Sequence, residues 1–91
     1  MVRVTLSPEA VASFRRLPES IKHEYDTLII AILGMARMRL PGRLAAHRLE
    51  GARGLWTLKA GPYRAIFRWD GNELRFIRFG HRASVYSSLP K

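Results

Sequence analysis

The C-terminal half of the chain alternates apolar and polar residues in three short runs. These runs cover residues 55–59, 63–69 and 74–79. Because successive side chains of a strand point to opposite faces, Arg64, Ile66 and Arg68 share one side of the middle run. The other side is apolar and consists of Tyr63, Ala65, Phe67 and Trp69. The alternation predicts a half-buried antiparallel sheet that displays guanidinium groups on its open face.

Glycine-rich turns separate these runs. An Asp70-Gly71 pair between the last two runs is a strong signal for an antiparallel hairpin, with a turn of either two or four residues. Ala60-Gly61-Pro62 separates the first two runs, and residues 43–54 form a connecting segment with room for a turn of helix.

The N-terminal half predicts one strand and two helices. Residues 2–6 alternate as a short strand, and Ser7-Pro8 supplies an N-cap and a first-turn proline for a helix that stops at Pro18. A second helix begins at Pro18-Glu19 and ends at residues 40–42. Its apolar stripe consists of Ile21, Tyr25, Leu28, Ile32 and Met35. The stripe either covers the core and a neighbouring helix or lends part of its width to a partner protein.

Length and composition indicate one domain spanning residues 1–91, without a linker. The absence of cysteine excludes disulfides, thiolate zinc sites and cysteine nucleophiles, and it favours a cytoplasmic protein. The start of the chain lacks the pattern of a signal peptide, and the longest apolar run, residues 28–33, is too short to span a bilayer. We therefore expect no membrane partner.

The charge is concentrated in the C-terminal half. Residues 1–42 carry a net charge of +2 and residues 43–91 carry +7, and 13 of the 16 basic residues are arginine. Arginine grips phosphate in a planar fork, so this bias favours a nucleic-acid partner over a merely solvated basic face.

Metal-free RNA cleavage needs a base for the 2'-hydroxyl proton, cations for the phosphate and an acid for the leaving 5'-oxygen. Four residues of these types are the predicted catalytic set: Arg64, Arg82, Tyr86 and His81. Four further cations are the predicted RNA-binding set: Lys59, Arg48, Arg68 and Arg78. The three histidines are scattered, so we expect no metal site and no cofactor.

Two motifs carry a resemblance to a known family. Gly61-Pro62-Tyr63-Arg64 and the segment Gly-His-Arg-Ala-Ser-Val-Tyr at residues 80–86 are similar to the signatures of the RelE/ParE superfamily of toxins from type II toxin-antitoxin systems. The likeness extends over the opening strand, the helix that begins at Ser7-Pro8 and the His47-to-Gly51 segment.

The resemblance implies a β-α-α-β-β-β domain of the α+β class, a helical hairpin on a mainly antiparallel four-stranded sheet. It implies ribosome-dependent mRNA cleavage without metal, a neutralising antitoxin, and operator DNA contacted only through the antitoxin complex. By resemblance, Arg64 and Arg82 stabilise the phosphate, and Tyr86 or His81 transfers a proton. The lysine pair of the second strand in the nucleases is represented here by Thr57 and Lys59.

Two other functions remain open. The gyrase-poisoning branch of the superfamily shares the fold and often the Gly-His-Arg signature, and a third possibility is an inactive member that only binds its antitoxin. The residues also have a purely structural interpretation, in which Arg64 pairs with Asp70 or Glu73 and Tyr86 packs on the sheet edge. Five aromatic residues are expected in the core rather than in contact with bases: Trp56, Phe67, Trp69, Phe76 and Phe79.

Overall fold

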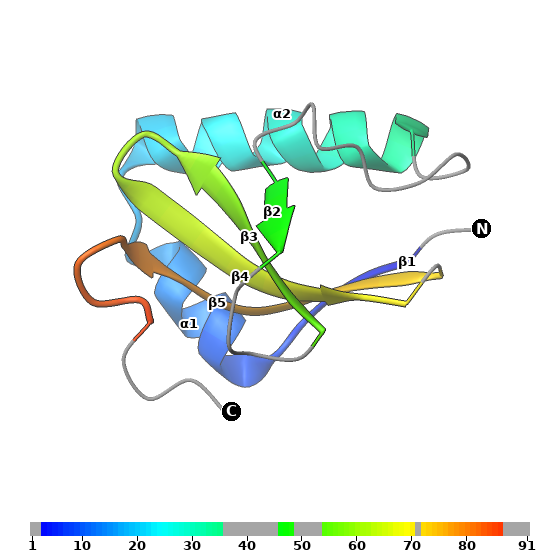
Figure 1. The fold of residues 1–91 in the computed structure, drawn as a ribbon. Helices are drawn as coiled ribbons and strands as arrows, with labels where there is room; N and C mark the ends of the chain where they lie inside the picture. Colours follow the sequence, from blue (N-terminus) through cyan, green and yellow to red (C-terminus); the bar gives the residue numbers. More distant parts are fainter. Residues whose placement is uncertain (1–2, 36–45, 49–53, 71, 87–91) are drawn as a thin grey trace.

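The computed structural model describes residues 3–35, 46–48, 54–70 and 72–86, with backbone only for residues 32–35 and 46–48. The elements follow one another as β1 (Arg3–Leu6), α1 (Pro8–Arg15), α2 (Glu19–Met35), β2 (Ala46–Arg48), β3 (Leu55–Ala60), β4 (Tyr63–Trp69) and β5 (Glu73–His81). The strands form one sheet in the order β1-β5-β4-β3-β2. Strand β1 runs parallel to β5 and the other neighbours are antiparallel, while both helices pack on one face (Figure 1).

This architecture confirms the predicted α+β fold of two helices on a mainly antiparallel sheet, but the sheet has five strands instead of the predicted four. The connecting segment before β3 contains the three-residue strand β2, which pairs with β3 at the sheet edge. The predicted end of the second helix at residues 40–42 lies outside the described residues.

Helix α1 begins where its capping residues predict. The Ser7 hydroxyl accepts a hydrogen bond from the Ala10 N–H at 3.0 Å, and Pro8 occupies the first turn, where a missing N–H costs nothing. The same hydroxyl donates to the Ile77 carbonyl at 2.8 Å, and the Ser7 N–H bonds to the Phe76 carbonyl at 3.0 Å. The cap therefore fixes the start of α1 to strand β5.

The main core lies between the helices and the sheet. Phe67, Phe76 and Phe79 are buried there, and Trp56 and Trp69 pack against them in part, which confirms the prediction that these aromatic residues belong to the core. Tyr25 of α2 is fully buried and donates its hydroxyl to the Leu58 carbonyl at 3.2 Å. Burial raises the pKa of Tyr25, so this phenol stays protonated.

A second, smaller apolar cluster lies on the opposite face of the sheet. It consists of Leu55, Ile66 and Val85, with Ile77 packed against it. The alternation of β4 correctly places Ile66 on the side of Arg64 and Arg68, but the expectation of a fully open face is wrong there. Val85 of the C-terminal turn covers Ile66, which is fully buried.

The β4–β5 hairpin has a four-residue turn and a bulge. Trp69 pairs with Leu74, so four residues separate these paired positions along the chain, and the Asp70 carboxylate accepts the N–H groups of residues 72 and 73 at 2.8 and 2.7 Å. These two bonds hold the pKa of Asp70 below its usual value. Further along, Phe67 pairs with Phe76 but Ile66 pairs with Arg78, so Ile77 is an extra residue in β5.

Candidate functional site

The chain after β5 folds back in a tight turn over residues 81–86. The N–H groups of Ser84 and Val85 bond to the His81 carbonyl at 2.9 and 2.8 Å. Val85 is 2% exposed and serves as the apolar anchor of the turn. A side chain at Gly80 would place its Cβ 3.3 Å from a Val85 methyl, so glycine permits this close approach. The turn is thereby pressed onto the sheet face that carries Arg64.

Arg82 and Arg64 lie beside the same β3–β4 turn. The backbone N–H of Arg82 bonds to the Pro62 carbonyl at 2.9 Å. The guanidinium of Arg64 donates to the carbonyls of Gly61 and Tyr63 at 2.9 and 2.8 Å through one nitrogen, Nη1. Its other N–H groups bond to nothing else in the described part of the chain, and no ion pair forms with Asp70 or Glu73 there. Arg64 is thus oriented by the backbone and keeps donors for an anion.

Lys59 and Tyr86 complete this group of residues. Lys59 is exposed and lies directly opposite Arg64 across β3 and β4, where side-chain Cβ atoms are about 5 Å apart. The Tyr86 hydroxyl lies 3.5 Å from the Thr57 hydroxyl, and Tyr86 is 38% exposed. Thr57 and Lys59 share one face of β3, so the phenol and the two sheet cations lie on the same side.

His81, the last residue of β5, lies on the face of the sheet opposite Arg64. It is paired with Tyr63, next to the Arg64–Gly80 pair, so Arg64 and His81 point to opposite faces. Its ring meets Tyr63 edge to face at 5.6 Å, and its Nδ1 accepts the Ala83 N–H at 3.1 Å. When the imidazole is neutral, its proton is therefore on Nε2. The structure does not bring His81 together with Arg64 and Tyr86.

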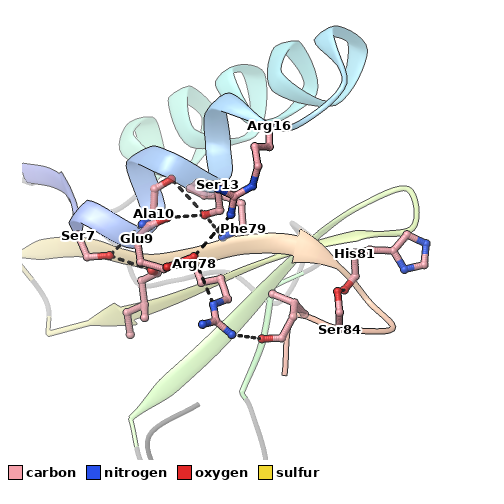
Figure 2. Close-up of polar contacts among 11 residues, drawn as sticks. Ser7, Glu9, Ala10, Ser13, Arg16, Arg78, Phe79, His81 and Ser84 are labelled. Carbon is pink, nitrogen blue, oxygen red and sulfur yellow. Dashed lines mark hydrogen bonds and ion pairs between the residues drawn. The ribbon is translucent and has the colours of Figure 1, made fainter. Parts of the chain in front are cut away.

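Arg78 is held inside a polar network between α1 and the C-terminal turn. Its Nε lies 3.8 Å from a Glu9 carboxylate oxygen, and its Nη1 donates to the Val85 carbonyl at 3.4 Å (Figure 2). Glu9 also pairs with Arg16 at 3.8 Å. These groups line a pocket of about 320 Å³ that includes His81 and Ser84. The structure thus gives Arg78, predicted to bind RNA, a set of contacts within the protein.

The two remaining predicted RNA-binding residues, Arg68 and Arg48, lie on different strands. Arg68 is exposed on the Arg64 face of β4, where Arg75 of β5 is its direct cross-strand partner. Arg48 lies opposite Trp56 in the pairing of β2 with β3, whereas His47 lies opposite Thr57. Val85 and Arg75 also belong to this side of the sheet, and neither was predicted as a site residue. Arg75 could have been found by pairing the hairpin with a four-residue turn.

Cations outnumber acids on this face. Among the residues that the structure describes, the three ion pairs involve Arg16, Lys22 and Arg78 as the cations. No cluster of three metal-ligand side chains occurs in the described ranges, and no described helix is long and apolar enough to cross a membrane. The geometry provides a partly exposed phenol on the same sheet face as guanidinium and ammonium groups that form no ion pair with the described residues.

The sequence profile of one protein family matches residues 4–86, and that family is described as the ParE toxin of the type II toxin-antitoxin system parDE. The chain belongs to the RelE/ParE toxin superfamily. It is therefore a type II toxin of the RelE/ParE fold, as the two signatures at residues 61–64 and 80–86 predict. No match was found among curated proteins.

Solved structures of RelE and YafQ toxins share this fold. The RelE toxin in the RelB-RelE antitoxin-toxin complex from Methanococcus jannaschii superposes with a TM-score of 0.78 at 20% identity, covering 94% of this chain and 99% of that chain. The intact E. coli RelBE toxin-antitoxin complex has a TM-score of 0.68 at 15% identity, and the match covers 89% of this chain and 96% of that chain. YafQ from E. coli strain BL21(DE3) has a TM-score of 0.68 at 18% identity, and the match covers 96% of this chain and 100% of that chain. The two RelE toxins were solved together with their antitoxins.

Proposed function

We propose that this RelE/ParE toxin is a ribosome-dependent endoribonuclease that cleaves mRNA without a metal ion. The observation that carries the proposal is the grouping of Lys59, Arg64 and Tyr86 on one sheet face, with Arg82 at its edge. Cations oriented in advance stabilise charge that develops on a phosphate, and a phenol O–H provides a transferable proton.

In the proposed reaction the 2'-oxygen of a nucleotide attacks the adjacent phosphorus. The P–O2' bond forms and the P–O5' bond breaks, which gives a 2',3'-cyclic phosphate and a free 5'-hydroxyl. The proton of the 2'-hydroxyl passes to water, and Tyr86 donates its proton to the departing 5'-oxygen. Arg64 and Arg82 bind the equatorial phosphate oxygens, whose negative charge grows during the attack.

His81 has a secondary role in this proposal. Its Nδ1 is occupied by the Ala83 N–H, and its ring lies on the side of the strand away from Arg64. The available Nε2 of a neutral imidazole carries a proton, so it donates a hydrogen bond rather than accepting one. His81 is therefore suited to contact the RNA beyond the reacting phosphate.

The test is mRNA cleavage on programmed ribosomes, read by primer extension and by analysis of the product termini. Tyr86→Phe keeps the ring and should lower kcat by about 10²- to 10⁴-fold. Arg82→Gln keeps the backbone bond to Pro62 and should lower it by about 10²-fold. Arg15→Gln removes an exposed charge from α1 and is the matched control. Wild-type cleavage that persists in both test variants would refute the assignment.

A second candidate function is inhibition of DNA gyrase without cleavage of RNA. The observation that favours it is the match of residues 4–86 to the ParE toxin family. Intact mRNA together with trapped gyrase–DNA breaks in cells that express the toxin would support this alternative and exclude the nuclease.

The proposal includes a cognate antitoxin as partner, because structures that share the fold contain RelB-type antitoxins. The excess of cations on the sheet face makes an acidic antitoxin segment the complementary ligand. Co-expression of the neighbouring gene should yield a complex that co-purifies and abolishes growth arrest. A neighbour whose product does not bind the toxin would contradict this part of the proposal.

A further inference from the structure

A pair of arginines at the far end of the same sheet face has no role in the proposed reaction. Arg68 of β4 and Arg75 of β5 are direct cross-strand partners, and both are exposed. Like charges placed directly opposite each other destabilise a sheet. The two guanidinium groups therefore repel each other across the strands, and an anion bound between them would relieve that repulsion.

Two acids lie beside this pair, and each is hydrogen-bonded elsewhere without losing its charge. Asp70 and Glu73 line the same hollow of about 240 Å³. The Asp70 carboxylate is engaged by two backbone N–H groups, and Glu73 accepts the Thr5 hydroxyl at 2.7 Å. Within the described residues neither arginine forms an ion pair. Both guanidinium groups are thus available to an anion.

The backbone at Gly54 lies close to the Arg68 guanidinium. Gly54 borders the hollow and has a φ of 73°, a conformation that favours glycine. A Cβ at Gly54 would lie 3.5 Å from Nη1 of Arg68, so the guanidinium rests directly over this part of the chain. The hollow is therefore bounded on one side by the glycine and on the other by two guanidinium forks.

We infer that Arg68 and Arg75 form a second phosphate subsite for the RNA strand whose scissile phosphate binds at Arg64. Arg64 and Arg68 share one face of β4 and are four residues apart, or about 13 Å along the strand. Ile66 lies between the two arginines on this face and is covered by Val85, so an RNA strand held at Arg64 would run beside the C-terminal turn to bring another phosphate to the pair. Two adjacent guanidinium groups provide the planar, multidentate contact that phosphate accepts.

The inference rests on the proposed function, since it takes RNA as the ligand, but its test is independent of cleavage. The probe is a 2'-O-methyl oligouridylate, which cannot be cleaved through its 2'-oxygen, and binding to the full chain is followed by fluorescence anisotropy at increasing KCl. Arg68→Gln/Arg75→Gln should weaken binding about tenfold at low salt. The slope of log K against log salt should fall by about 0.7, the value for one phosphate of a single strand.

The matched control is Arg15→Gln/Lys22→Gln, which removes two positive charges from α1 and α2, outside the arginine-bearing sheet face. The affinity of each protein is also measured for oligomers of increasing length. The wild-type protein should gain affinity once an oligomer reaches both subsites, and the Arg68/Arg75 double variant should lack that gain while the control retains it.

Two outcomes would overturn the subsite. One is a salt slope equal to that of the control variant. The other is normal RNA binding combined with weakened binding of the antitoxin, which would assign the pair to an acidic protein segment. Weakened RNA binding by the double variant, together with a wild-type protein that cuts no mRNA on ribosomes, would support the subsite and refute only the nuclease proposal.

Discussion

Val85→Ala tests whether the C-terminal turn is a separate cooperative unit that keeps Tyr86 in place. Val85 is 2% exposed and packs with Leu55 and Ile66. The substitution removes two buried methyl groups, each worth about 0.8 kcal/mol of transfer free energy, and leaves a small cavity. The expected loss is about 2 kcal/mol in the free energy that closes the turn onto the sheet.

This loss should appear as local opening. A change of about 2 kcal/mol corresponds to a roughly 30-fold larger open population, because 1.4 kcal/mol is a factor of ten. The N–H groups of Ser84 and Val85 bond to the His81 carbonyl inside the turn, so their hydrogen exchange should accelerate by about that factor. Amide groups in the central strands should keep their exchange rates, since the main core lies on the other face.

Val11→Ala is the control, because Val11 is 37% exposed on α1 and the same methyl groups are removed without a cavity. Equal exchange at residues 84 and 85 in the two variants would show that Val85 does not hold the turn. Accelerated exchange throughout the sheet would show instead that the turn opens only with global unfolding. Either result would refute the local model.

Two further substitutions test the bonds that join the helices to the sheet. Ser13→Ala removes the hydroxyl that accepts the Phe79 N–H at 3.0 Å in a buried position, and the unsatisfied donor should lower the free energy of unfolding by about 1–3 kcal/mol in urea titrations. Tyr25→Phe removes the bond to the Leu58 carbonyl and should cost about 1 kcal/mol at pH 7. Because the folded state raises the pKa of Tyr25, wild-type stability should fall as pH rises above 10.0, where the unfolded phenol ionises, and the phenylalanine variant should lose that part of the dependence. Identical alkaline profiles for both proteins would contradict this explanation.

The sequence predicts the elements well where local chemistry determines them. Ser7 and Pro8 place the start of α1, and the Asp70-Gly71 pair places the last hairpin. The turn length was undecided because it depends on contacts outside the pair. The Asp70 carboxylate bridges two N–H groups of the four-residue turn, and the Asn72 carbonyl accepts the N–H of Arg3 from β1.

The bulge at Ile77 is the feature that a simple alternation could not supply. Without it, the pairing of Trp69 with Leu74 would continue to Arg78 opposite Ala65, which faces the helices. The extra residue turns Arg78 to the other face and directs Phe79 into the core. The sequence does mark the bulge, because the spacing of the apolar residues 74, 76 and 79 changes from two residues to three.

The bulge also explains why the candidate site depends on the whole fold although its residues are close in sequence. The bulge places Arg78 opposite Ile66, where its guanidinium bonds to the Val85 carbonyl and also reaches Glu9 of α1 around the edge of the sheet. The residue next to Val85 is Tyr86. The phenol is therefore positioned from β5 through the register, from α1 through Glu9, and from the sheet face through the burial of Val85. A pattern of residue types along one strand can suggest a phenol and cations for phosphate chemistry, but contacts between distant parts of the chain are needed to bring them to the same surface.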